Sequence, residues 1–341
     1  MTALLTTTDL AMRFPGRHGL TDLLRGIPRP VVRALDGVSL DVRPGETLGI
    51  VGESGCGKST LARCLVGLHR PNAGAVRYQG TDIATLRGSA RQAFHRQVQM
   101  VFQDPYGSLN PLMSVGASLA EALAVHRIVP PADIPRRVQD LLDRVHLPAT
   151  AANRYPHEFS GGQRQRIGIA RALAVEPKII VADEPVSALD VSVQAQIVNL
   201  LQELQTSLGL TLVFITHDLR LVRHLTHRVA VMYLGRIVEL GPTEDVFASA
   251  RHPYTQALLR AVPRLVPGQR SRDVAVRGEL PSPLAPPPGC AFHPRCQRAE
   301  PDCAATVPAL ALREGHWPVA CLQADRAIAH SSTIATSTPS V

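Results

Sequence analysis

Apolar residues occur along the chain in two patterns, short dense runs and longer stretches with helical spacing. The short runs Thr47–Val51, Lys178–Ala182 and Thr211–Ile215 have the length and continuity of buried strands. Helices are predicted over Leu61–Leu68, Val115–Val125, Ile134–Val145 and Val191–Leu208, and from His252 to about Val262. Because strands alternate with helices, the expected fold class is α/β with a mostly parallel sheet. The segment from about 86 to 160 lacks β-rich runs, so we expect a helical subdomain there.

A glycine-rich loop follows the first of these strands and opens the first helix. Gly52–Ser59 fits the pattern G-x-x-x-x-G-K-[ST] in the strand-to-helix context that the motif requires. Its glycines let backbone N–H groups turn inward around phosphate oxygens, and the helix dipole points its positive end at the same place. Lys58 is predicted to reach the β- and γ-phosphates of a nucleotide, and the Ser59 hydroxyl to bind Mg²⁺. The alternative is a glycine-rich turn without a ligand.

Two carboxylates follow the second apolar run. A buried strand would deliver Asp183 to its C-terminal tip, beside the phosphate loop, where it would hold Mg²⁺ through water. Glu184 would then be placed to polarise an attacking water molecule. An apolar strand that ends in Asp-Glu is weak support alone, but it becomes strong beside a phosphate loop.

Four further motifs resemble those of ATP-binding cassette ATPases. Phe159–Gln163 is similar to the signature Leu-Ser-Gly-Gly-Gln, and Ser187–Asp190 is similar to the D-loop. Gln103 resembles the Q-loop glutamine, and His217 resembles the switch histidine after a β-strand. The order and spacing of these motifs match the cassette from about residue 5 to 250.

The resemblance implies a P-loop ATPase core with a mostly parallel sheet, an antiparallel β subdomain and a helical subdomain. It implies that ATP lies between the phosphate loop of one subunit and the signature of another, in a head-to-tail dimer. His217 would contact the γ-phosphate and Gln103 would sense Mg²⁺ and water, while Phe14 would stack on adenine unless it is a core residue. The implied nucleotide contacts are Phe14, Gly52, Glu53, Ser54, Gly55, Cys56, Gly57, Lys58, Ser59, Thr60, Ser160, Gly161, Gly162 and Gln163. The implied catalytic residues are Glu184, His217 and Gln103, and the implied Mg²⁺ site is Ser59, Gln103 and Asp183.

Two segments point to a subfamily. Asp104–Pro111 and His252–Leu259 resemble the ATPases of oligopeptide and dipeptide importers, of the second-ATPase type. The resemblance implies ATP-driven peptide uptake with a second ATPase subunit and two transmembrane permeases, and a solute-binding protein acting indirectly. Nickel importers share these features and remain an alternative. A soluble cassette ATPase is disfavoured because a second cassette and a long coiled-coil insertion are missing, and a non-catalytic module is disfavoured by intact catalytic motifs.

Composition and charge indicate where the protein acts and which classes of partner are disfavoured. The net charge of +8 is spread along the chain, and 4% aromatic residues argue against a base-stacking nucleic-acid platform. There is no run of 18 apolar residues, and the N-terminus does not resemble a signal peptide. We therefore expect a peripheral protein on the cytoplasmic face of the cell membrane. Only Lys58 and Lys178 are lysines, so Lys58 stands out in an arginine-rich chain.

Four of the six cysteines, Cys290, Cys296, Cys303 and Cys321, lie near the C-terminus. Their segment resembles the C-terminal motif of the same importer ATPases, which in some members binds a [4Fe-4S] cluster, and four thiolates suit such a cluster. Zinc or unligated thiols remain alternatives, although four thiolates would need compensating positive charge. We expect a cassette over 1–262, a proline-rich linker over 263–289, the cysteine segment over 290–325 and a disordered tail over 326–341. The linker would let the cysteine segment sit apart from the nucleotide site.

Overall fold

Two β-sheets form the framework of the protein, whose structure is a computed structural model that describes residues 3–16, 29–261, 278–312 and 316–324. The larger sheet has six strands in the order β10-β9-β3-β8-β7-β6. All neighbouring strands in it are parallel except β10 and β9, which are antiparallel. These strands are β3 (Thr47–Val51), β6 (Val98–Val101), β7 (Ile179–Asp183), β8 (Thr211–Thr216), β9 (Arg228–Tyr233) and β10 (Arg236–Pro242). The α/β fold class is thus confirmed.

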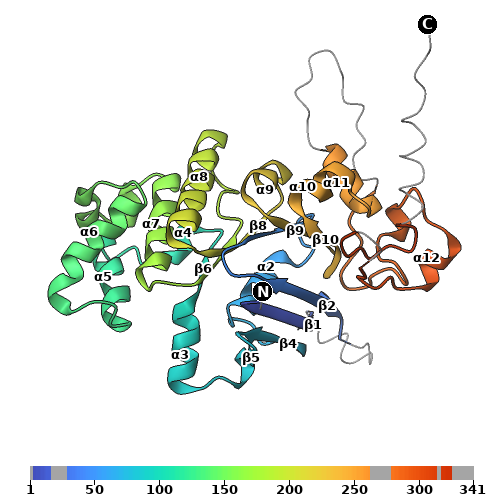
Figure 1. Ribbon diagram of the computed structural model, residues 1–341, viewed down its shortest axis with the longest axis horizontal. Coiled ribbons are helices and arrows are strands. Elements are labelled where there is room, and N and C mark those ends of the chain that lie inside the picture. Colours follow the sequence, from blue (N-terminus) through green and yellow to red (C-terminus); the bar gives the residue numbers. More distant parts are fainter. Residues whose placement is uncertain (1–2, 17–28, 262–277, 313–315, 325–341) are drawn as a thin grey trace, which may run out of the picture.

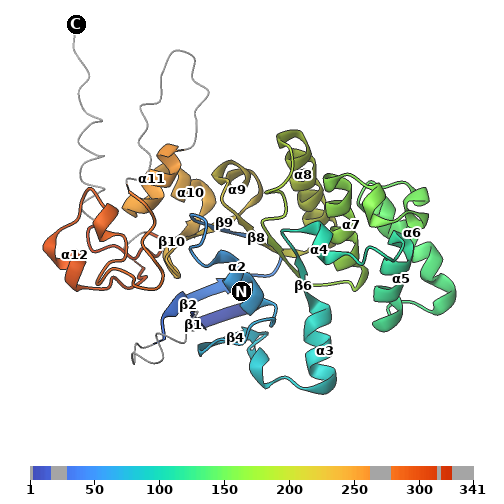
Figure 2. The same cartoon turned by 180° about the vertical axis from the view of Figure 1, so that it is seen from behind.

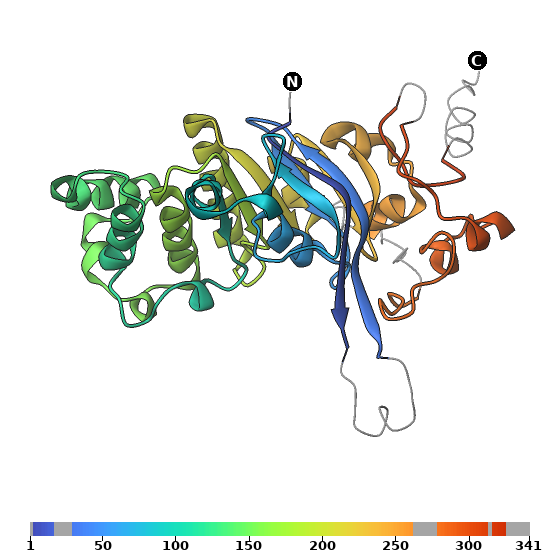
Figure 3. The same cartoon turned by 90° about the horizontal axis from the view of Figure 1, so that it is seen from below.

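The smaller sheet is antiparallel and has the order β2-β1-β4-β5. Its two long strands project together from the body of the molecule (Figure 3). Leu10, Leu35 and Val38 are fully buried between this sheet and the larger one, in a core shared with β3 and α2. The strands are β1 (Leu5–Pro15), β2 (Val31–Val42), β4 (Ala73–Tyr78) and β5 (Thr81–Asp82).

Helices cover the sheets and build a separate lobe at one end of the molecule (Figure 1). In chain order, the first of these helices are α2 (Lys58–Leu65), α3 (Gly88–Gln97), α4 (Pro105–Ser108), α5 (Val115–Val125), α6 (Ile134–Arg144), α7 (Gly161–Ala174) and α8 (Val191–Leu208). The remaining ones are α9 (Leu219–Leu225), α10 (Thr243–Ser249), α11 (Pro253–Ala261) and α12 (Pro301–Ala305), with short 3₁₀ turns at 83–85, 131–133, 149–153, 156–158 and 293–295.

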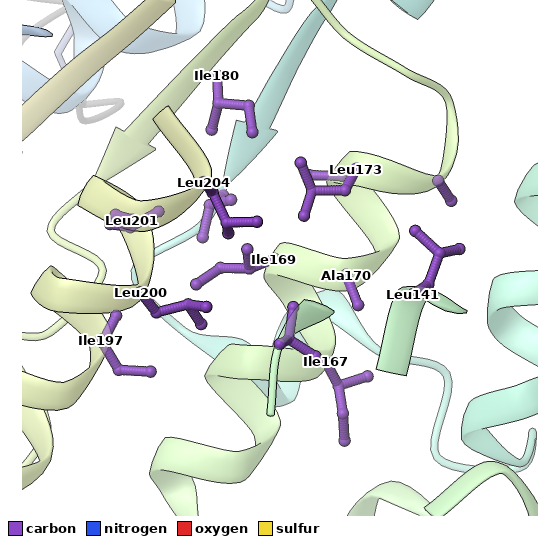
Figure 4. Close-up of a cluster of buried hydrophobic side chains, with 14 of the residues drawn as sticks. Leu141, Ile167, Ile169, Ala170, Leu173, Ile180, Ile197, Leu200, Leu201 and Leu204 are labelled. Atoms are coloured by element: carbon purple, nitrogen blue, oxygen red, sulfur yellow. The ribbon is translucent and has the colours of Figure 1, made fainter. Parts of the chain in front are cut away.

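The lobe is joined to the larger sheet by a continuous apolar core. Apolar side chains of α7 point between α8, α6 and strand β7 (Figure 4). The labelled members are Leu141, Ile167, Ile169, Ala170, Leu173, Ile180, Ile197, Leu200, Leu201 and Leu204, all at most 4% exposed. The residue that starts α7 is therefore fixed relative to the strand that ends at Asp183.

Strand β6 departs from the expected all-helical segment over 86–160. Val98–Val101 pairs in parallel with Ile179–Ala182 at the edge of the larger sheet. The run Val-Gln-Met-Val is four residues long and follows a helix directly, so local periodicity does not reveal it. Its pairing with a strand far along the chain determines its structure.

The C-terminal segment lies against the cassette rather than apart from it, which corrects the expectation of a separate unit. Residues 317–320 run along β10, where the Leu240 N–H donates to the Pro318 carbonyl at 3.0 Å and the Ala320 N–H to the Val238 carbonyl at 2.8 Å. Trp317 donates its indole N–H to the buried Glu239 carboxylate at 2.8 Å. Seen from behind, this segment lies beside β10 and α11 (Figure 2). Residues 262–277 and 325–341, with parts of the linker and the expected tail, lie outside the described residues.

Candidate functional site

The phosphate loop joins β3 to α2, as the sequence predicts. Gly57 precedes the helix with φ of 108°, a conformation that side-chain-bearing residues rarely adopt. A Cβ atom there would also lie 2.3 Å from the Ala34 carbonyl oxygen. Cys56 is buried, and burial raises the pKa of its thiol, so it acts as a small packed residue. The loop therefore presents the N-terminus of α2 to a phosphate.

Lys58 lies inside this loop with 4% of its surface exposed. Its ammonium group donates to the Gly52 carbonyl at 2.8 Å and to the Glu53 carbonyl at 3.0 Å. The Glu184 carboxylate lies 3.8 Å from the same nitrogen. Three oxygens thus hold the lysine charge at the place where the sequence predicts phosphate.

Ser59 and Asp183 meet across the loop. The Ser59 hydroxyl donates to Asp183 Oδ1 at 3.0 Å. Burial raises the pKa of Asp183, the Ser59 hydrogen bond opposes that effect, and the charge of Glu184 adds to it. A hydroxyl and a carboxylate suit Mg²⁺, which binds through one or two protein oxygens together with water and substrate phosphates. The two residues therefore fit the predicted metal role.

Glu184 is the centre of the site. It has φ of 44°, an uncommon value for a residue other than glycine and one often found at functional sites. Its Oε2 lies 3.6 Å from His217 Nδ1 and accepts a hydrogen bond from Gln103 Nε2 at 3.4 Å. The other two implied catalytic residues, Gln103 and His217, therefore lie beside Glu184.

Three strand ends bring these side chains together. Gln103 follows β6, Asp183 ends β7, and His217 follows β8. Since these strands are neighbours in a parallel sheet, their carboxyl ends share one edge, which is where ligands bind in open α/β sheets. Half of the His217 side chain is exposed, so it can meet a ligand from solvent.

The signature segment starts helix α7. Ser160 caps the helix by accepting the Gln163 N–H, while the Gln163 side chain accepts the Ser160 N–H. A Cβ atom on Gly162 would lie 2.3 Å from a methyl group of Val193, and one on Gly161 would lie 3.1 Å from Leu189. The signature glycines are thus needed for close packing against the D-loop and α8, a role that the sequence motif alone does not reveal.

Phe14 lies near the end of β1, opposite Val32 of β2. Its half-buried ring meets the His69 ring edge-on, with the centroids 5.6 Å apart. The predicted adenine contact stays a prediction, because no interaction between Phe14 and the phosphate loop is seen.

The four C-terminal cysteines lie within electrostatic range of one another, but they are not arranged as a mononuclear metal site. No three His, Cys, Asp or Glu side chains within the described ranges are grouped to hold a single metal ion. Burial raises the pKa of Cys290 and Cys296, and raises that of Cys321 to about 11.

Two residues near the phosphate loop escaped the sequence analysis. Arg295, between Cys290 and Cys296, forms a two-point ion pair with the Glu53 carboxylate, at 2.8 and 3.0 Å. The Tyr254 hydroxyl accepts the Glu53 N–H at 2.9 Å. Arg295 and Tyr254 lie 242 and 201 residues from Glu53 along the chain, so no local sequence pattern links them to the phosphate loop. Tyr254 belongs to the motif at 252–259, but that motif indicated only the subfamily.

Comparison with known proteins gives the family. Residues 35–187 match a family model described as ABC transporter, and residues 238–303 match one described as oligopeptide/dipeptide transporter, C-terminal region. The chain is 54% identical to the probable peptide ABC transporter ATP-binding protein y4tS of Sinorhizobium fredii, over 89% of this chain and 86% of that protein. It is 49% identical to the oligopeptide transport ATP-binding protein OppF of Salmonella typhimurium, over 94% and 96%.

A solved structure shows the same cassette fold. The dimeric post-hydrolysis state of the ATP-binding cassette MJ0796 bound to ADP and Pi matches with a TM-score of 0.59 at 28% identity, over 70% of this chain and 98% of that one. Motifs, site geometry and relatives agree, and the chain belongs to the ATP-binding subunits, the ATPases, of ABC transporters.

Proposed function

We propose that this chain binds and hydrolyses ATP to drive the uptake of di- or oligopeptides through a membrane importer. The observation that carries the ATPase part is the meeting of Lys58, Ser59, Asp183, Glu184 and His217 at one sheet edge. The peptide part is supported by relatives named as peptide transport proteins and by the matched C-terminal region.

The geometry gives each residue a role in hydrolysis. The N-terminus of α2 and the Lys58 ammonium would bind the phosphates, and Ser59 and Asp183 would hold Mg²⁺, which would neutralise phosphate charge. Glu184 accepts a hydrogen bond from the attacking water, and Gln103 orients the same carboxylate. His217, 3.6 Å from Glu184, contacts the γ-phosphate. Phosphate oxygens would take the place of the Glu184 carboxylate beside the Lys58 ammonium.

A second cassette completes the site in this proposal. Ser160 at the start of α7 offers a second anion-binding helix end, in a lobe distinct from the phosphate loop (Figure 1). The similar cassette MJ0796 was solved as a dimer. We propose a head-to-tail dimer in which the signature of each subunit faces the phosphate loop of the other.

The proposed place of action is the cytoplasmic face of the cell membrane, where the chain would bind two permease subunits. A solute-binding protein would deliver the solute to these permeases. No helix in the described parts of the chain is long and apolar enough to cross a membrane. Residues 103–111, which connect the nucleotide site to the lobe, are the proposed contact with the permeases. Leu112, directly after this segment, is 85% exposed.

We also propose that Cys290, Cys296, Cys303 and Cys321 ligate a [4Fe-4S] cluster. The segment supplies four thiols, and backbone N–H groups donate to two of the sulfurs, from Arg298 to Cys296 and from Gln323 to Cys321, each at 3.4 Å. Such hydrogen bonds tune cluster potentials. A cubane also holds its ligand sulfurs further apart than a single ion does. The lack of a mononuclear site among the described residues therefore disfavours zinc more than the cluster.

The cluster is tested by anaerobic purification of the full chain. A brown protein with about four irons and four sulfides per chain is expected. Replacing Cys303 with Ser should abolish the colour, whereas replacing Cys64, on α2, should not. A colourless anaerobic preparation with one zinc per chain would contradict the cluster and leave the ATPase assignment intact.

Peptide import is tested in cells that lack this chain. Wild-type protein should restore uptake of radiolabelled di- and oligopeptides, and the Lys58→Ala variant at equal abundance should not. Restored nickel uptake with no effect on peptides would contradict the peptide substrate but not the importer ATPase.

A further inference from the structure

Residues near the C-terminus contact Glu53 of the phosphate loop through both its side chain and its main chain. The Arg295 guanidinium contacts both carboxylate oxygens of Glu53, and the Tyr254 hydroxyl accepts the backbone N–H of the same residue. Glu53 is thus fixed at its side chain and its main chain by two residues from beyond the motif-bearing part of the cassette.

The contacts to Glu53 are held in place because the residues that make them are buried and packed together. The Arg295 side chain is 6% exposed and also donates to the Gly278 carbonyl at 3.0 Å and the Tyr233 hydroxyl at 3.4 Å. Phe292, three residues earlier and 3% exposed, packs against the rings of Tyr254 and Tyr233 at 5.4 and 5.3 Å. A bidentate ion pair with little solvent access fixes orientation far better than an exposed one.

Glu53 in turn holds the lysine that binds phosphate. Its carbonyl accepts a hydrogen bond from the Lys58 ammonium at 3.0 Å, beside the bond to the Gly52 carbonyl. Rotation of the Glu53 peptide would move this carbonyl and the lysine with it. The contacts therefore run without a break from the cysteine segment to Lys58.

We infer that Arg295 and Tyr254 are positioning residues of the nucleotide site, and that through them the cysteine segment sets the affinity of the phosphate loop for ATP. The inference rests on the proposed function only in that the loop binds ATP. It gives the C-terminal segment a task in the ATPase cycle beyond carrying four cysteines. Because linkage is reciprocal, bound nucleotide also stabilises the docked segment.

The test compares binding of the Mg²⁺ complex of a non-hydrolysable ATP analogue to full-length variants by calorimetry. Tyr254→Phe removes one oxygen atom from a buried ring, and Arg295→Ala removes the ion pair. Each should raise the dissociation constant about tenfold, the scale expected inside one hydrogen-bonded network. Arg295→Lys keeps the positive charge but not the two-point guanidinium geometry, so its dissociation constant should lie between those of wild type and Arg295→Ala.

Matched controls separate positioning from general damage. Arg260→Ala removes an exposed arginine from α11, the helix that carries Tyr254, and should bind like wild type. Glu53→Gln combined with Arg295→Ala should cost little more than either alone, because both break the same contact. Thermal unfolding in the absence of nucleotide identifies any variant that fails to fold.

Steady-state kinetics give a readout that a purely structural role would not move. The KM for ATP should rise in Tyr254→Phe while kcat changes less than about twofold, as for lost ground-state binding. A fall in kcat at unchanged KM, or wild-type affinity in folded Tyr254→Phe and Arg295→Ala proteins, would overturn the inference. If wild type itself binds no nucleotide, the proposed function fails instead.

Discussion

At the scale of single residues, Glu184 combines a strained backbone with a crowded side chain. Its positive φ is maintained by a hydrogen bond from its N–H to the Ile215 carbonyl at 3.0 Å, on the neighbouring strand. The sheet thus holds the carboxylate toward Lys58 and His217. Strain held by a rigid framework is a common way to keep a catalytic group ready for its substrate.

Replacing Glu184 with Gln should therefore stop turnover without stopping binding. The amide keeps the shape and the hydrogen-bond acceptor but does not accept a proton from water. The rate of phosphate release should fall about 100-fold or more, the usual scale for loss of a general base. Lys58→Ala should instead weaken ATP binding itself. Near-normal phosphate release by Glu184→Gln would remove this residue from the chemistry.

At the scale of elements, α7 and α8 pack tightly at Gly162. Replacing it with Ala forces a methyl group into Val193, and overpacking of this kind costs about 1–3 kcal/mol of unfolding free energy. Val193→Ala in the same chain should recover much of that loss in urea unfolding. Gly168→Ala is the matched control, because it lies on the same helix with no atom near its Cβ position. Equal stability of the Gly162 and Gly168 variants would refute this packing argument.

The segment over 103–111 is the element expected to contact the permeases. Ser108 is half-buried, so Leu112, directly after the segment and 85% exposed, is the better position for a cross-linking cysteine. With the permeases co-expressed, Leu112→Cys carrying a short bifunctional linker should capture a permease chain. Gln202→Cys, at an exposed position on α8, should not. No capture from any position of the loop would place the contact elsewhere.

Elements with strong local patterns were predictable, while those defined by distant partners were not. Thr47–Val51 and Val115–Val125 match the expected strand and helix, because their apolar spacing determines their structure. Motif spacing also identified Lys58, Asp183 and His217, whose meeting follows from neighbouring parallel strands. Arg295 could not be found this way, since its role depends on the docking of the C-terminal segment onto β10. A proline-rich linker predicts that the segment after it lies apart from the cassette only when that segment makes no contacts with the cassette.

At the scale of the whole molecule, the cassette and the C-terminal segment share a buried histidine. His252 accepts the Tyr254 N–H at Nδ1 and bonds the backbone of Ala320, beside Cys321. Burial lowers its pKa from 6.5 to about 3, although the bond to Ala320 opposes this. The folded protein thus keeps His252 neutral, whereas the unfolded chain takes up a proton there below about pH 6.5.

The contribution of His252 to the free energy of unfolding should therefore be constant above pH 6.5 and decline as the pH falls toward 3. One proton taken up on unfolding gives a slope of about 1.4 kcal/mol per pH unit. Between pH 6.5 and 5, where few carboxylates titrate, urea unfolding of His252→Gln should lose stability less steeply than wild type. Parallel slopes for the two proteins would show that His252 is not buried neutral.

The scarcity of lysine has a practical consequence for handling the protein. Of the two side-chain amines, Lys58 is held by three oxygens inside the loop, while Lys178 is exposed at the start of β7. Strand β7 ends at Asp183, so the exposed amine lies about 16 Å away, at the opposite end of the strand from the site. Among the side-chain amines, an acylating dye or surface would thus attach at Lys178 and leave the phosphate loop untouched. Once the α-amine of the chain is blocked, the native sequence carries one oriented attachment point, at the end of β7 away from the site.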